Sequence, residues 1–87
     1  MPKISYFYGI TIKMYWREGH HSTPHFHAYY GEYEASFDFA GKLIAGSLPP
    51  RALRHIRDWA ELHVDDLHAD WQRILNKEPP EPIAPLP

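Results

Sequence analysis

The residues of this chain best suited to chemistry lie close together, at His25 and His27. Two side chains at positions i and i+2 of an extended segment point to the same side of the chain. An imidazole changes charge near neutral pH, so it can donate or accept a proton, and its neutral form can bind a metal ion. The pair therefore predicts acid–base catalysis, a divalent metal site or a surface that binds a polar partner. His25 and His27 are the candidate catalytic residues.

Two strands joined by a tight turn are predicted to carry these histidines. Residues 25–30 and 33–39 each alternate between apolar and polar side chains, as strands with one buried face do. Gly31-Glu32 separates them and suits a two-residue type II′ turn, which takes glycine at its first position. The turn fixes a register with one apolar face, formed by the cross-strand pairs Tyr30–Tyr33, Ala28–Ala35 and Phe26–Phe37.

The opposite face of this hairpin is polar and brings a carboxylate to the histidines. The register places His25 across from Asp38 and His27 across from Ser36. A carboxylate beside an imidazole can orient the ring for proton transfer or, with both histidines, complete a metal site. The face could equally be a solvent-exposed surface without a function, since polar residues belong there by default. The side chains that we expect to bind a partner on this face are Tyr29, Glu34, Ser36 and Asp38.

Arginines form a second group of candidates. Arg51, Arg54 and Arg57 recur every three residues near the start of a predicted helix and could contact phosphate groups. Arg51 and Arg54 are therefore added to the candidate binding residues. Arg54 and Arg57 also stand four residues before an acid, so the competing prediction is a solvated helix face with ion pairs. No cofactor is expected, because the chain lacks the phosphate-loop, dinucleotide, HExxH and G-x-S-x-G motifs.

The remaining pattern predicts an α+β fold. Alternation over residues 10–17 indicates one strand, the aromatic segment 4–8 indicates another, and residues 43–45 could add a short edge strand. Apolar residues recur at helical spacing over residues 51–76. One helix of that length would measure about 39 Å, too long for so small a sheet, so we expect a break near residues 64–66, with an aspartate as the cap. The prediction is a small antiparallel sheet of three to four strands, followed by one broken or two C-terminal helices packed on one face.

Length limits this protein to one domain. A chain of 87 residues can bury one core, which we assign to residues 1–77. Residues 78–87 contain five prolines and can form neither a helix nor a central strand. We therefore expect them to form a tail that is either frayed or laid on a neighbouring molecule.

Composition and charge limit the cellular compartments and the kinds of partner that we expect for this protein. Without cysteine, the chain can form no disulfide, thiolate metal site or cysteine nucleophile. No segment approaches the roughly 20 apolar residues of a membrane span, which predicts a cytoplasmic protein with no membrane contact. The net charge is −2, with residues 1–57 net positive and residues 58–87 net negative. This polarity and the small size favour a protein partner or self-association into a homo-oligomer, with a nucleic acid as a further candidate.

Several segments of the chain also carry a family resemblance. They are residues 4–10, 14–15, 24–27, 30–35, 62–63 and 83–86. Together they closely resemble the small bacterial domain-of-unknown-function family numbered 4160, whose Pro-His-Phe-His signature matches Pro24, His25, Phe26 and His27. The resemblance implies a free-standing bacterial protein, often encoded beside another small protein in an arrangement similar to toxin–antitoxin gene pairs. The family has no established reaction.

The expected function follows from the histidine pair and this resemblance. The leading hypothesis is a module of a toxin–antitoxin-like gene pair that binds a protein partner, or else a nucleic acid. One alternative is a ribonuclease-like toxin in which His25 or His27 is the general acid or base. The other is a protein that binds a metal through histidines and carboxylates.

Overall fold

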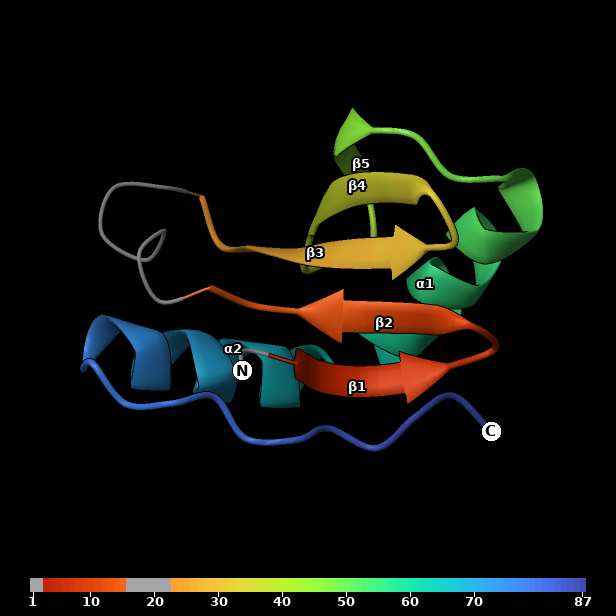
Figure 1. Ribbon diagram of the computed structural model, residues 1–87. Helices are drawn as coiled ribbons and strands as arrows, with labels where there is room; N and C mark the ends of the chain where they lie inside the picture. The colour runs from red at the N-terminus through yellow and green to blue at the C-terminus, as the bar shows by residue number, and fades with distance from the viewer. Residues whose placement is uncertain (1–2, 16–22) are drawn as a thin grey trace.

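The computed structural model describes residues 3–15 and 23–87 of the chain. Within these residues, five strands are followed by two helices (Figure 1). The strands are β1 (Lys3–Phe7), β2 (Ile10–Lys13), β3 (His25–Tyr30), β4 (Tyr33–Asp38) and β5 (Leu43–Gly46). The helices are α1 (Pro50–Leu62) and α2 (Val64–Leu75). The predicted α+β class and the order of strands before helices are confirmed.

The strands form one antiparallel sheet in the order β1-β2-β3-β4-β5. The prediction of three to four strands was wrong, because the described chain has five. Strand β5 lies at the short edge strand that was predicted over residues 43–45, so the total was too low although no individual strand was missed. All its residues are exposed, so it lacks the alternation of buried and exposed side chains that marks a half-buried strand.

The hairpin of β3 and β4 has the predicted register at every pair, from His25 opposite Asp38 to Tyr30 opposite Tyr33. Gly31 has a φ of 57°, and Glu32 does not share the left-handed conformation. This is the φ pattern of a type II′ turn, in which only the first central residue needs a positive φ. Glycine at that position therefore fixes which face of the hairpin is buried.

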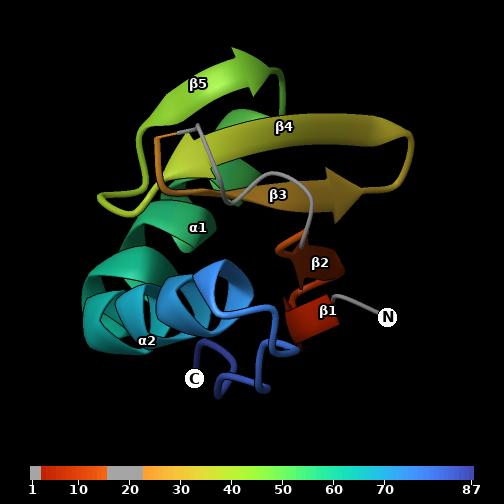
Figure 2. The same ribbon diagram turned by 90° about the vertical axis from the view of Figure 1, so that its left-hand side faces the viewer.

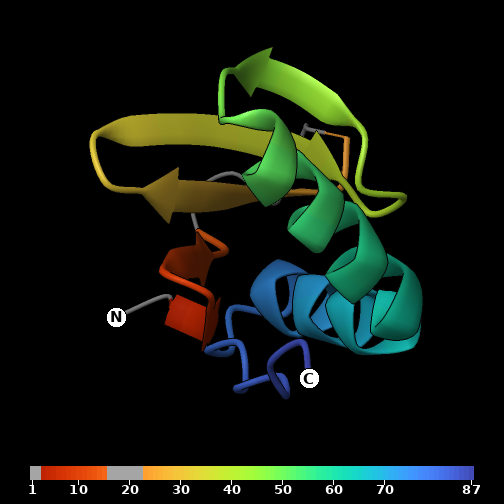
Figure 3. The same cartoon turned by 90° about the vertical axis from the view of Figure 1, so that its right-hand side faces the viewer.

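The two helices lie on the same side of the sheet, as predicted (Figures 2 and 3). Trp59 of α1 is fully buried, with its ring centroid 5.5 Å from that of Phe26 and 5.3 Å from that of Phe7. Phe37 lies 5.6 Å from Phe26 in the same layer. Burial of such large aromatic side chains dominates the stabilisation of a core this small.

The helical segment breaks at His63, next to the predicted position. The predicted aspartate cap was wrong. His63 is the N-cap of α2, with no side-chain cap hydrogen bond in the described chain, and Asp65 and Asp66 occupy the first turn. The Nδ1 of His63 instead donates to Asp66 Oδ2 at 3.2 Å. Acids in a first turn still stabilise a helix, because they interact favourably with the positive end of its dipole.

Residues 78–87 are packed against the body of the protein along β1 (Figure 1). Ile83 is buried, and its N–H donates to the carbonyl of Ile4 at 2.6 Å. The indole Nε1 of Trp59 donates to the carbonyl of Ala84 at 2.9 Å. The expected frayed tail is therefore wrong, since this segment covers its own domain and satisfies polar groups of the core.

Neither of the two described helices has the length and apolar character needed to cross a membrane.

Candidate functional site

The predicted histidines lie on the side of the sheet that the helices do not cover. Along β3, Phe26 and Ala28 are fully buried, whereas His25, His27 and Tyr29 are half-buried. Strand β2 pairs with β3 so that Lys13 lies opposite His27. We call the surface formed by Lys13, Tyr15, His25, His27 and Tyr29 the histidine face.

Ring contacts hold the histidine face together. The ring centroids of His25 and His27 are 5.3 Å apart, and Tyr15 meets His27 edge to face at 5.0 Å. The hydroxyls of Tyr15 and Tyr29 are hydrogen-bonded, and Lys13 Nζ lies 5.0 Å from the Tyr29 ring. Each ring therefore restricts its neighbour, which makes this a stiffer surface than separate polar side chains would give.

His25 marks the point where the histidine face meets α2. Its Nδ1 donates to the carbonyl of Thr23 at 2.7 Å, so in the neutral ring Nε2 is the nitrogen that can accept a proton. Its ring centroid lies 5.5 Å from that of Trp71 on α2. The face is thus bounded by a helix at this end rather than open to solvent throughout.

Asp38 occupies its predicted position opposite His25, but its carboxylate has a structural role. Asp38 Oδ1 accepts the backbone N–H groups of Ala40 and Lys42, each at 2.9 Å. These bonds fix the turn between β4 and β5, as an aspartate at the start of a turn commonly does. One carboxylate oxygen is therefore already engaged by the backbone.

The other predicted residues of β4 are placed as expected. Ser36 lies opposite His27 and is half-buried, and Glu34 lies opposite Tyr29 and is exposed. Within residues 3–15 and 23–87, no group of three or more histidine, aspartate or glutamate side chains is arranged to hold a metal ion. His20 and His21 fall in residues 16–22, outside the described residues.

The arginine candidates are separate from the histidine face. Arg51 and Arg54 are exposed on the first turns of α1, on the other side of the sheet. Among the residues that the structure describes, no ion pair involves Arg51, Arg54 or Arg57, so the predicted helical pairs are not formed. Arg51 instead lines a cavity together with His55 and Tyr8. The structure therefore divides the predicted site into two distant groups.

Two important residues, Tyr15 and Asp70, were not identified from the sequence. Tyr15 lies on the polar side of the alternating segment, and that alternation was the signal that could have placed it beside His27. Asp70 is fully buried in α2, where its Oδ1 accepts Arg73 Nη1 at 2.7 Å and the N–H of Glu81 at 2.8 Å. Burial raises the pKa of Asp70, against the opposing effect of these two hydrogen bonds. Asp70 thus anchors the C-terminal segment.

These features define a class of protein: a small α+β domain whose antiparallel sheet has helices on one side and an aromatic, imidazole-bearing surface on the other. The chain belongs to the family described as Domain of unknown function (DUF4160), which matches residues 9–72. The match includes the whole histidine face and α1. No curated protein and no solved structure matches the chain.

Proposed function

We propose that this protein is a binding module that recognises a protein partner through the histidine face. The observation that carries the proposal is the interlocked set of rings formed by Tyr15, His25, His27 and Tyr29. Tyrosines are enriched in protein interfaces, because they bury a large area and lose little conformational entropy. A surface whose rings already restrict one another loses less conformational entropy when a partner binds.

The geometry favours binding over catalysis at this face. General acid–base chemistry requires a positioned proton donor and acceptor, and a carboxylate commonly orients the imidazole. The nearest predicted carboxylate, that of Asp38, accepts two turn amides through Oδ1. An oxygen that already accepts two backbone amides is less available to orient an imidazole, which favours a docking surface over a proton relay.

We further propose that the protein is bacterial and cytoplasmic and acts within a toxin–antitoxin-like gene pair. The partner would be the small protein encoded beside it or a second copy of this chain. This setting is what the resemblance to the family implies about its gene arrangement, which is similar to that of toxin–antitoxin pairs. A small domain also gains stability from a partner that binds its folded state.

A double variant, His25→Gln with His27→Gln, tests the binding proposal. The wild-type chain is co-expressed and titrated with the neighbouring gene product, and its self-association is followed by sedimentation. The double variant should remain folded, with stability changed by about 0.5 kcal/mol per substitution, and should weaken the dominant interaction at least tenfold. His63→Gln is the matched control, because it makes the same change at the junction of the helices. A double variant that binds both candidates as the parent does would refute the proposal.

A histidine-dependent ribonuclease is the second candidate, favoured by the 5.3 Å separation of the two imidazole rings. At that spacing one ring could accept a proton while the other donates one. RNA cleavage by the purified wild-type protein, lost in the double variant, would establish it. Elemental analysis of the same preparation tests the metal-binding alternative.

A further inference from the structure

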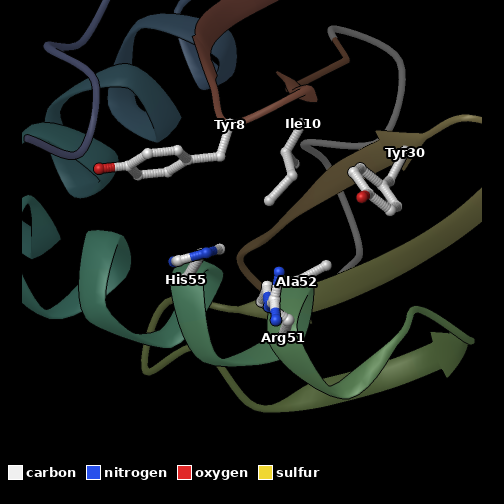
Figure 4. Close-up of a pocket in the computed structure, with 6 residues that line it drawn as sticks. All are labelled: Tyr8, Ile10, Tyr30, Arg51, Ala52 and His55. Atoms are coloured by element: carbon white, nitrogen blue, oxygen red, sulfur yellow. The ribbon is translucent and has the colours of Figure 1, made fainter.

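A cavity of about 250 Å³ lies between the β1–β2 turn, the end of β3 and the start of α1 (Figure 4). Its lining residues are Tyr8, Ile10, Tyr30, Arg51, Ala52 and His55. Figure 4 shows Tyr8 and His55 on one side, Tyr30 on the other, and Ile10 between them. The cavity lies far along β3 from His25 and on its other face, so it is a separate site from the histidine face.

The cavity combines an apolar floor with a positively charged rim. Ile10 and Ala52 are buried, whereas Arg51 is exposed. None of the lining residues is acidic. Arg51 forms no ion pair with any residue in the ranges 3–15 and 23–87. An arginine beside a hollow that forms no ion pair with a described residue is suited to a carboxylate or phosphate, whose oxygens match the guanidinium fork.

The backbone adds to this positive character. Helix α1 begins at Pro50, and its first turn contains no acid and no side-chain cap within the described chain. The N–H of Leu53 already donates to Pro49. Proline has no N–H, so the helical pattern leaves the amides of Arg51 and Ala52 without an intrahelical acceptor. Both belong to residues that line the cavity, and amides at this end of a helix favour an anion.

The wall of the cavity is built at a conformational cost. Tyr8 has a φ of 49° and Gly9 a φ of 79°, so both central residues of the β1–β2 turn are left-handed. Such turns favour asparagine or glycine, and a tyrosine there costs roughly 1 kcal/mol or more. Its ring stacks on His55 with centroids 4.6 Å apart, and its hydroxyl donates to the carbonyl of Pro87. The strained residue thus places a fixed aromatic surface at the cavity.

We propose that this cavity binds a phosphate monoester whose organic group carries an aromatic ring. Arg51 and the first amides of α1 would hold the phosphate oxygens, and the stacked rings of Tyr8 and His55, with the Ile10 floor, would contact the organic group. Anion donors and a flat apolar surface occur together here. Inorganic phosphate would contact only the donors, and a neutral ring would contact only the apolar surface. The ester is a free small molecule or the terminal nucleotide of a nucleic acid.

Titration of the full chain with phenyl phosphate, followed through backbone amide NMR signals, tests this proposal. The signals of Ala52 and His55 should shift and saturate, and phenyl phosphate should bind at least tenfold more tightly than inorganic phosphate or phenol alone. Arg51→Gln should weaken binding at least tenfold. Arg54→Gln is the matched control, because this exposed arginine lies one turn along α1 outside the cavity, and it should bind as the parent does.

Two further measurements sharpen the outcome. The His25→Gln and His27→Gln double variant should bind phenyl phosphate normally, which separates this site from the proposed protein interface. A 5′-phosphorylated single-stranded oligonucleotide that binds more tightly than phenyl phosphate would assign the site to nucleic-acid ends, and weaker binding would assign it to free esters. Absence of saturable shifts in the wild type, or an Arg51→Gln variant with unchanged affinity, would overturn the proposal.

Discussion

The two edges of the sheet are closed in different ways. At the β1 edge, residues 83–87 run parallel to the strand, because Ile83 bonds to Ile4 and Pro87 accepts a hydrogen bond from Tyr8. Ile83 is 7% exposed. The five prolines of the final segment have no N–H, so the segment covers the edge without presenting a complete new set of strand donors.

At the β5 edge no comparable cover is present in the described chain. Leu43 and Ile44 are exposed, and the pairing with β4 is irregular between Phe37 and Ser36, where Ile44 has no direct partner. Gly46 has a φ of 83°, and a Cβ there would meet the carbonyl oxygen of Glu34 at 2.2 Å. A short strand with a bulge is a poor template for a further strand.

The comparison shows that the β1 edge contributes to the core, whereas the β5 edge only disfavours pairing with a further strand. The C-terminal segment contributes a buried isoleucine, a partner for the Trp59 indole and a support for the cavity wall at Tyr8. Strand β5 contributes backbone pairing but no buried side chain. Changes at the β1 edge should therefore cost much more stability than equivalent changes at the β5 edge.

Removal of residues 83–87 is the strongest way to test this difference. The truncation uncovers part of the core and leaves the Trp59 indole N–H and the Ile4 carbonyl without their partners. We expect a loss of about 4 kcal/mol or more, since a buried isoleucine and two hydrogen bonds are lost together. A chain of this size has only about 4–13 kcal/mol of stability in total. Urea unfolding followed by tryptophan fluorescence measures the loss, and an unchanged midpoint would mean that the segment is dispensable.

A smaller, matched change compares the edges directly. Ile83→Ala should lower the free energy of unfolding by about 2–3 kcal/mol, because the side chain is buried against the core. Ile44→Ala makes the same chemical change on a side chain that is 53% exposed, and should cost under about 0.5 kcal/mol. Equal losses for the two variants in urea would contradict the assignment of the β1 edge to the core.

A feature could be predicted from the sequence when the residues that determine it lie close together in the chain. The hairpin register was predictable because Gly31 and Glu32 lie between the paired strands, and the common face of His25, His27 and Tyr29 followed from it. The need for a break in the helical segment followed from its length. The packed tail, the cavity beside Arg51 and the role of Asp70 depend on residues far apart in the chain, and local periodicity carries no information about such contacts.

The smallest expected effect concerns Asp70, which anchors the C-terminal segment. It is a dependence of the protein's stability on pH. Burial raises the pKa of Asp70, so the folded protein retains a proton at pH values where the unfolded chain has released it. The stability that this group contributes is therefore greatest below the ordinary aspartate range. It falls as the pH rises from that range to the raised pKa, and is constant above it.

Asp70→Asn should remove this dependence. An asparagine cannot titrate, and its side-chain oxygen can still accept the hydrogen bonds from Arg73 and Glu81. The stability of the variant relative to the wild type should therefore improve as the pH rises through that window, by less than the loss expected for Ile83→Ala. Urea unfolding at a series of values between about pH 3 and 7 measures the difference. Asp58→Asn makes the same chemical change at an exposed position of α1 and is the matched control. If the wild type and Asp70→Asn differ by the same amount at every pH, the buried carboxyl does not titrate within this range, and its attachment to the C-terminal segment is independent of pH.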